Sequence, residues 1–135
     1  MKYLALVYQS EKAMNAMGQQ AWDALNQECM ACGADLTGSG HMLMGQALQS
    51  VETATTVRVR DGKVTTTDGP FAETKEQLAG FYLLDARDLN EAIQLASKIP
   101  PARLGCVEIR PVRELVEEGN ALYGSEEEDT SQPAK

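Results

Sequence analysis

Histidine is nearly absent from this sequence, because His41 is the only one among 135 residues. A catalytic triad, or a metal site built on several histidines, therefore has little support. The sequence also lacks a glycine-rich phosphate loop and a dinucleotide fingerprint. We therefore expect neither a metal nor an organic cofactor.

Positive charge is scarce as well, with 12 lysines and arginines against 20 acidic residues and a net charge of −8. Such an acidic chain is a poor partner for phosphate backbones and anionic lipid. No apolar run approaches the roughly 18 residues of a membrane helix, and the apolar N-terminal segment 2–8 is too short for a signal peptide. We expect a cytoplasmic protein with no nucleic-acid or membrane partner.

The cysteines number only three, and an odd count does not suggest a disulfide framework. Cys29 and Cys32 have the C-x-x-C spacing of half a redox or zinc motif, but only Cys106 and His41 remain to complete four zinc ligands. Both residues fall on the apolar stripe of a predicted helix. We interpret them as buried structural thiols.

The first half of the chain predicts a strand, a helix and a second strand. Residues 2–8 are apolar on both faces of a strand. Apolar residues then recur every three or four positions, which predicts a helix over 15–37 that ends at Gly38-Ser39-Gly40. A short strand is expected over 41–48, followed by a loop.

The second half adds a hairpin, a strand, a helix and a last strand. Asp61-Gly62 lies between residues 54–60 and 63–67, a strong signal for a two-residue hairpin in which Val59 faces Val64. A strand is expected over 81–84. Asp88 is a predicted N-cap with Glu91 as its capping-box partner, and the helix that follows ends at Pro100-Pro101. The last strand is expected over 106–110.

The C-terminal region divides into two parts. Residues 113–123 are expected to form one or two helical turns. From residue 124 the chain is polar and acidic, with four consecutive acids at 126–129, so we expect a disordered tail over 124–135 after a domain over 1–123.

This order of elements predicts a ferredoxin-like α+β fold, βαββαβ with an added hairpin and both helices on one sheet face. The strands are apolar on both faces, so the second face also needs a cover. A second copy of the chain is the simplest cover, and we therefore expect a homodimer.

Residues 68–82, DGPFAETKEQLAGFY, combine turn formers, acids and a lysine, and they resemble the signature of the DGPF group of YCII-related proteins. The hairpin at 54–62, the strand at 107–112 and the first four residues resemble that group too, so the likeness covers about residues 1–113. The resemblance implies a dimeric α+β barrel with a cleft in each protomer. It also implies a small bacterial family, largely without assigned activity, often encoded near extracytoplasmic-function sigma factors.

The resemblance further implies that some relatives use a His-Asp pair, and that some are lactone or muconolactone-type enzymes. The family histidine lies on the first helix, about three turns before the glycine that ends it. That position falls at or near Cys29 here, so the sequence departs from the family pattern where a base would be expected. A thiol at Cys29 could face the cleft instead.

The signature stretch holds several candidate site residues, each with two interpretations. Asp68 is either a general base or polar anchor, or a turn residue that bonds its own backbone. Glu73 and Lys75 either bind a polar substrate or lie on a surface turn. Phe71 is expected to plug the core or the dimer interface rather than to stack on a ligand.

Candidates outside that stretch also carry alternatives. His41 has either a catalytic role or an edge position at the start of a strand. Tyr8 and Tyr82 offer hydroxyls as ligand contacts or as satisfied core groups. The strand arginines Arg58, Arg60 and Arg110 are either solvated or bind an anion.

Three functional hypotheses follow. The first is a dimer that binds a small polar molecule in a cleft beside the Asp68 to Phe71 loop. The second is a cofactor-independent isomerase, lyase or hydrolase with Asp68 as base or anchor. The third is an interaction module that engages a sigma factor, with the acidic tail as the contact.

Overall fold

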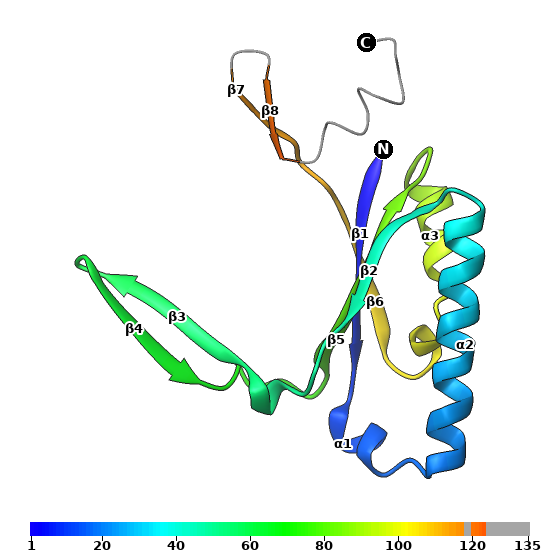
Figure 1. Cartoon of the computed structure of the whole chain (residues 1–135), viewed down its shortest axis with the longest axis horizontal. Coiled ribbons are helices and arrows are strands. Elements are labelled where there is room, and N and C mark those ends of the chain that lie inside the picture. Colours follow the sequence, from blue (N-terminus) through cyan, green and yellow to red (C-terminus); the bar gives the residue numbers. More distant parts are fainter. Residues whose placement is uncertain (118–119, 124–135) are drawn as a thin grey trace.

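A computed structural model describes residues 1–117 and 120–123 of the chain. Its main body runs in the order β1 (Lys2–Gln9), α1 (Glu11–Asn15), α2 (Gln19–Gly38), β2 (Met42–Ala47), η1 (Val51–Thr53), β3 (Thr55–Arg60), β4 (Lys63–Asp68), β5 (Gln77–Asp85), α3 (Leu89–Ala96), η2 (Pro100–Arg103) and β6 (Cys106–Pro111) (Figure 1). A short hairpin of β7 (Leu115–Glu117) and β8 (Asn120–Tyr123) follows.

The central sheet has the strand order β2-β5-β1-β6, and every pair in it is antiparallel. Helices α2 and α3 lie on the same side of this sheet (Figure 1). The arrangement confirms the predicted ferredoxin-like α+β fold, with β3 and β4 as the added hairpin.

The core lies between the sheet and its helices. Alternate residues of β1 point toward the helices, and Tyr3, Ala5 and Val7 are buried there. They pack with buried apolar residues of the neighbouring elements, namely Leu36, Leu84, Ala86, Ala92, Leu95, Ala96 and Ile99. Helix α3 contributes the small side chains of Ala92 and Ala96 to this core.

The opposite face of the sheet, here called the open face, carries no helix among the described residues (Figure 1). The strand period of two places the remaining residues of β1 and β5 on it. Leu4 lies opposite Leu83 and Leu6 opposite Phe81, so apolar side chains occupy the middle of this face. All four are only half-buried.

Strands β3 and β4 form an arm that projects away from the sheet (Figure 1). Asp61 and Gly62 both have positive φ, 52° and 75°, as a type I′ turn requires. Val59 pairs with Val64, which confirms the predicted register. The apolar face of the arm is exposed in the protomer.

Four local predictions need correction or refinement. The predicted helix 15–37 begins later, as α2 after Gly18, and a separate short helix, α1, which Ser10 caps, precedes it. Strand β5 begins at Gln77 rather than 81, because Gln77 and Leu78 pair with Gln9 and Tyr8 of β1.

The other two concern the second half of the chain. Residues 115–117 and 120–123 form strands rather than helical turns, in keeping with strand-favouring Val116 and Tyr123. Helix α3 starts at the predicted Asp88 N-cap but ends at Ala96, before Pro100. It buries Ala92, Leu95 and Ala96, whereas Ile93 is exposed.

The predicted tail 124–135 lies outside the described residues. Among the helices that are described, none has the length and apolar character needed to cross a membrane.

Candidate functional site

The loop after β4 is held by its own backbone. Gly69 has φ of 102°, a conformation that favours glycine. Its N–H donates to the Ala54 carbonyl at 2.7 Å, and its carbonyl accepts from the Thr56 hydroxyl at 2.8 Å. The loop is therefore fixed against the start of β3, at the root of the arm.

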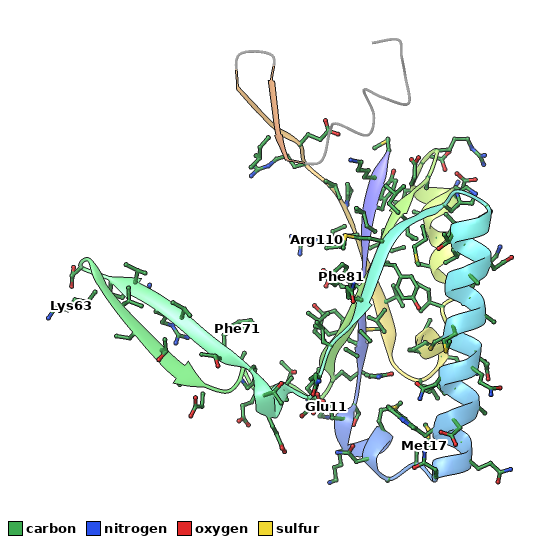
Figure 2. All side chains as sticks on the ribbon, in the orientation of Figure 1. Glu11, Met17, Lys63, Phe71, Phe81 and Arg110 are labelled. Atoms are coloured by element: carbon green, nitrogen blue, oxygen red, sulfur yellow. The ribbon has the colours of Figure 1, made fainter. Side chains whose placement is uncertain are left out.

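A cavity of about 720 Å³, here called the DGPF cavity, lies beside this loop. Figure 2 places Phe71 near the root of the arm, while Glu11 lies near the end of β1. The lining residues come from β1, from the segment between β2 and β3, from the segment between β4 and β5, and from the first two residues of β3 and of β5: Tyr8, Leu48, Gln49, Ser50, Val51, Thr53, Ala54, Thr55, Thr56, Pro70, Phe71, Ala72, Thr74, Glu76, Gln77 and Leu78.

The polar groups of this lining are hydroxyls, amides and a single carboxylate, that of Glu76. Glu76 Oε1 accepts a weak hydrogen bond from the Cys106 thiol at 3.6 Å. Burial, and then Glu76, raise the pKa of Cys106, so the thiol stays protonated and remains a donor. Burial, followed by the nearby Glu108, raises the pKa of Tyr8, which therefore presents a neutral phenol.

One wall of the DGPF cavity is tied to the start of α1. Both oxygens of Glu11 accept hydrogen bonds, one from the Ser50 hydroxyl at 2.8 Å and one from the Val51 N–H at 2.9 Å. The Glu11 N–H in turn donates to the Gln77 side chain at 2.8 Å. These bonds connect three separate segments of the chain, which pre-organises the lining.

The predicted residues of the signature stretch are distributed unevenly around this cavity. Asp68 is the last residue of β4 and pairs with Thr55. Asp68, Glu73 and Lys75 line neither this cavity nor the second cavity, between α2 and the sheet. The enzyme hypothesis requires Asp68 to face the cleft. Phe71 lines the DGPF cavity but is 82% exposed, so the expectation that it plugs the core of the protomer is wrong.

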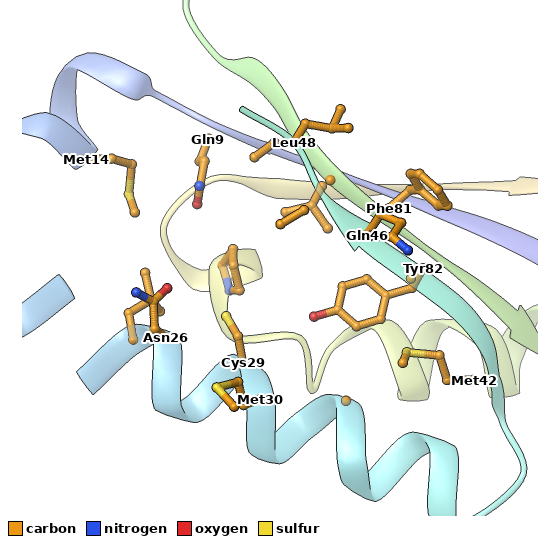
Figure 3. A pocket seen from close by; sticks show the side chains of 18 of the residues that line it. Gln9, Met14, Asn26, Cys29, Met30, Met42, Gln46, Leu48, Phe81 and Tyr82 are labelled. Atoms are coloured by element: carbon orange, nitrogen blue, oxygen red, sulfur yellow. The ribbon is translucent and has the colours of Figure 1, made fainter. Parts of the chain in front are cut away.

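Cys29 and Tyr82 meet in a second cavity of about 470 Å³, here called the helix–sheet cavity, which lies between α2 and the sheet (Figure 3). Burial, followed by the Cys29 and Cys32 thiols, raises the pKa of Tyr82 to about 12. Burial, and then Cys32 and Glu28, raise the pKa of Cys29. Both groups are therefore protonated near neutral pH, and Cys29 is not an activated nucleophile.

The remaining predicted residues lie elsewhere. His41 Nδ1 is 3.0 Å from the Asp85 carbonyl oxygen, and His41 lines neither cavity. Arg58 pairs with Thr65, and Arg60 with Lys63, on the exposed arm. Within the described residues, no group of three or more His, Cys, Asp or Glu side chains is arranged to hold a metal ion.

Sequence reasoning missed two lining residues that carry chemistry. Glu76 lies directly before β5, and the late predicted start of that strand hid its position near Cys106 of β6. Gln9, which lines the helix–sheet cavity, ends β1 one residue beyond the predicted strand. In both cases a correct prediction of the strand boundary, the start of β5 or the end of β1, would have indicated the residue.

A family model and one relative match most of this chain. The family model described as YCII-related domain matches residues 1–116. An uncharacterized protein of Rhizobium meliloti is 33% identical over 114 residues, which cover 83% of this chain and 92% of that protein. The match to the family model spans the whole central sheet, helices α1, α2 and α3, and the arm.

Proposed function

The chain belongs to the YCII-related family, and from that premise we propose that it is a homodimer that binds a small polar molecule in the DGPF cavity. The observation that carries the proposal is the cavity beside the signature loop, lined by one carboxylate and a group of hydroxyls. Its volume lies within the range of roughly 300–1,000 Å³ that is typical of small-molecule sites.

The lining favours a ligand rich in hydrogen-bond donors. Glu76 accepts hydrogen bonds and carries negative charge, while Ser50, Thr56 and Thr74 each offer a hydroxyl. Among the described residues no lysine or arginine lines the cavity, so an anionic ligand would lose its hydration without gaining a cation from them. The ligand class that fits is a neutral or cationic polyol, amide or amine.

The open face supports the dimer. It presents apolar residues such as Leu6 and Leu83 in the middle of the sheet, where a monomer would expose them to water. A second copy can cover this face by the same residues, as a two-fold axis requires. The open face continues from β1 and β5 toward the DGPF cavity, because Tyr8 and Leu78 pair at the end of these strands and both line the cavity.

A cytoplasmic location and a stress-related or sigma-factor context are further proposals, and the second comes from the family resemblance alone. Removal of residues 125–135 followed by a binding assay with a sigma factor tests the role of the tail in such a contact.

The proposed ligand site is tested with two matched variants of one loop. Glu76 lines the cavity, whereas Glu73, three residues earlier, is exposed outside it. A thermal-shift screen of polar compounds on the wild-type protein identifies a ligand, and calorimetry then measures its dissociation constant for Glu76→Gln and Glu73→Gln.

We expect Glu76→Gln to weaken binding about tenfold to a hundredfold, since a hydrogen bond to a charged group contributes roughly 1.5–3 kcal/mol and about 1.4 kcal/mol corresponds to a factor of ten. Glu73→Gln should leave the affinity unchanged. Equal affinities for both variants would place the ligand elsewhere.

A further inference from the structure

Gln9 has a buried oxygen with no partner. Its side-chain Oε1 is inaccessible to solvent and accepts no hydrogen bond from the residues that the structure describes. Buried polar atoms are nearly always paired, because an unpaired one costs roughly 1–3 kcal/mol. Gln9 lines the helix–sheet cavity at the end of β1. Because the terminal torsion of a glutamine side chain is soft, rotation of the amide can turn Oε1 toward a donor inside that cavity.

Glycine occurs on both walls of the helix–sheet cavity. Gly45 and Gly80 lie on the sheet side and Gly33 lies on α2. A Cβ at Gly80 would come within 2.7 Å of the Gln46 carbonyl oxygen, so this position admits no side chain. A Cβ at Gly33 would meet only the Met42 methyl, at 3.7 Å. The cavity beside α2 therefore has room for a side chain at this position.

The lining of this cavity is apolar and carries no charge. Trp22 and Tyr82 supply aromatic rings, and Met14, Met30 and Met42 supply flexible thioethers that pack well against rings. Within the part of the chain that the structure describes, no Asp, Glu, Lys, Arg or His belongs to the lining. The nearby Arg103 is paired with Glu28 at 2.6 Å, so its charge is already balanced outside the cavity.

A few polar groups converge on this apolar space from different elements. Figure 3 shows Gln9, Asn26, Cys29 and Tyr82 around the same cavity. The Tyr82 phenol and the Cys29 thiol are protonated donors near neutral pH, and Gln9 contributes the unpaired acceptor. An apolar cavity with a few convergent polar groups is the usual form of a small-molecule site.

We propose that the helix–sheet cavity is a second ligand site, which takes a neutral aromatic molecule whose hydroxyl donates to Gln9 Oε1. The ring of the ligand lies among Trp22, Tyr82 and the methionines. An anionic ligand is excluded, because its charge would be buried without a cation. The site lies within one protomer and shares only Leu48 with the DGPF cavity, so it does not depend on the function proposed above.

The proposal is tested with 2-naphthol and two analogues. In 2-methoxynaphthalene the donor is lost while the ring is kept, and 2-naphthoate adds a negative charge. Binding is followed by quenching of Trp22, the only tryptophan of the chain, and by calorimetry. We expect 2-naphthol to bind about tenfold more tightly than 2-methoxynaphthalene, as one neutral hydrogen bond allows. Naphthoate should bind most weakly.

The Gln9→Leu variant tests whether Gln9 accepts the hydrogen bond from the ligand hydroxyl. The variant should bind 2-naphthol only as well as 2-methoxynaphthalene, with the affinity for the methoxy compound unchanged. Gln94→Leu, an exposed position on α3 outside the cavity, is the matched control and should retain the tenfold preference. Glu76→Gln should also retain it, which separates this site from the DGPF cavity.

Gly33→Leu fills the cavity and provides an independent test that does not involve Gln9. It should abolish binding of both neutral compounds, whereas Gly38→Leu, where a Cβ meets nothing within 4 Å, should leave binding intact. The proposal is overturned if neither neutral compound binds the wild-type protein. It is equally overturned if Gln9→Leu keeps the preference for 2-naphthol, or if Gly33→Leu still binds.

Discussion

At the residue scale, Cys29 and Tyr82 show how far side-chain roles follow from sequence. Both were named as candidate ligand contacts, and they line one cavity. Asp68, Glu73 and Lys75 were named on equal grounds and line neither cavity. Strand and helix periods predict which way a residue in a regular element faces. They say nothing of residues 69–76, whose path depends on bonds such as Thr56 to Gly69.

The raised pKa of Tyr82 predicts a dependence of stability on alkaline pH. The unfolded chain loses this proton near pH 10, whereas the folded protein holds it to about pH 12. Between these values the unfolded state binds fewer protons, so the free energy of unfolding must fall as the pH rises. Below pH 10 both states are protonated, and this contribution is fully present.

Urea unfolding of the wild-type protein and Tyr82→Phe between pH 9 and 12 measures this effect. The variant should lose less stability over the interval, because it has no phenol to ionise. Parallel pH profiles for the two proteins would show that burial of Tyr82 does not raise its pKa.

At the element scale, boundaries were predicted best where a side chain marks them. The Asp61-Gly62 turn and the Asp88 cap are confirmed, and both act through local geometry. The early start of β5 is different, because Gln77 is polar and joins the strand only by pairing with Gln9 of β1. Such tertiary pairing leaves no local signal in the sequence.

The Asp88 cap of α3 gives the second stability prediction. Asp88 Oδ1 accepts from the Glu91 N–H at 2.9 Å, and the Glu91 carboxylate accepts from the Arg87 N–H at 2.7 Å. Asp88→Ala should lower the free energy of unfolding by about 1 kcal/mol, while Asp88→Asn should retain most of it. Urea denaturation measures both variants, and an equal loss for Ala and Asn would argue against the capping role.

At the scale of the whole molecule, the apolar open face is the feature that a single chain leaves unexplained. Residues 2–8 are apolar on both faces of their strand, which predicts two buried faces, yet the helices cover only the face of Tyr3, Ala5 and Val7. The fold was predictable because the order and periods of its elements are strong signals. The two cavities were not, because they depend on how loops and glycines from distant segments come together.

The proposed dimer predicts the behaviour of a charge on the open face. Leu6→Asp should convert the dimer to a folded monomer, since a two-fold axis would bury the carboxylate twice without a partner. Ile93→Asp, at an exposed position of α3 on the helix side, is the control and should remain dimeric. Sedimentation velocity measures the mass, and circular dichroism checks the fold. A monomeric wild-type protein, or a dimeric Leu6→Asp, would contradict the proposed interface.

The central claim is that the signature loop forms one wall of a ligand site, and a crystal structure of the protein with its strongest screening hit tests it most directly. The account predicts electron density for the compound in the DGPF cavity, within hydrogen-bond distance of Glu76 and beside Tyr8. Density for the compound only at another place on the molecule would contradict it.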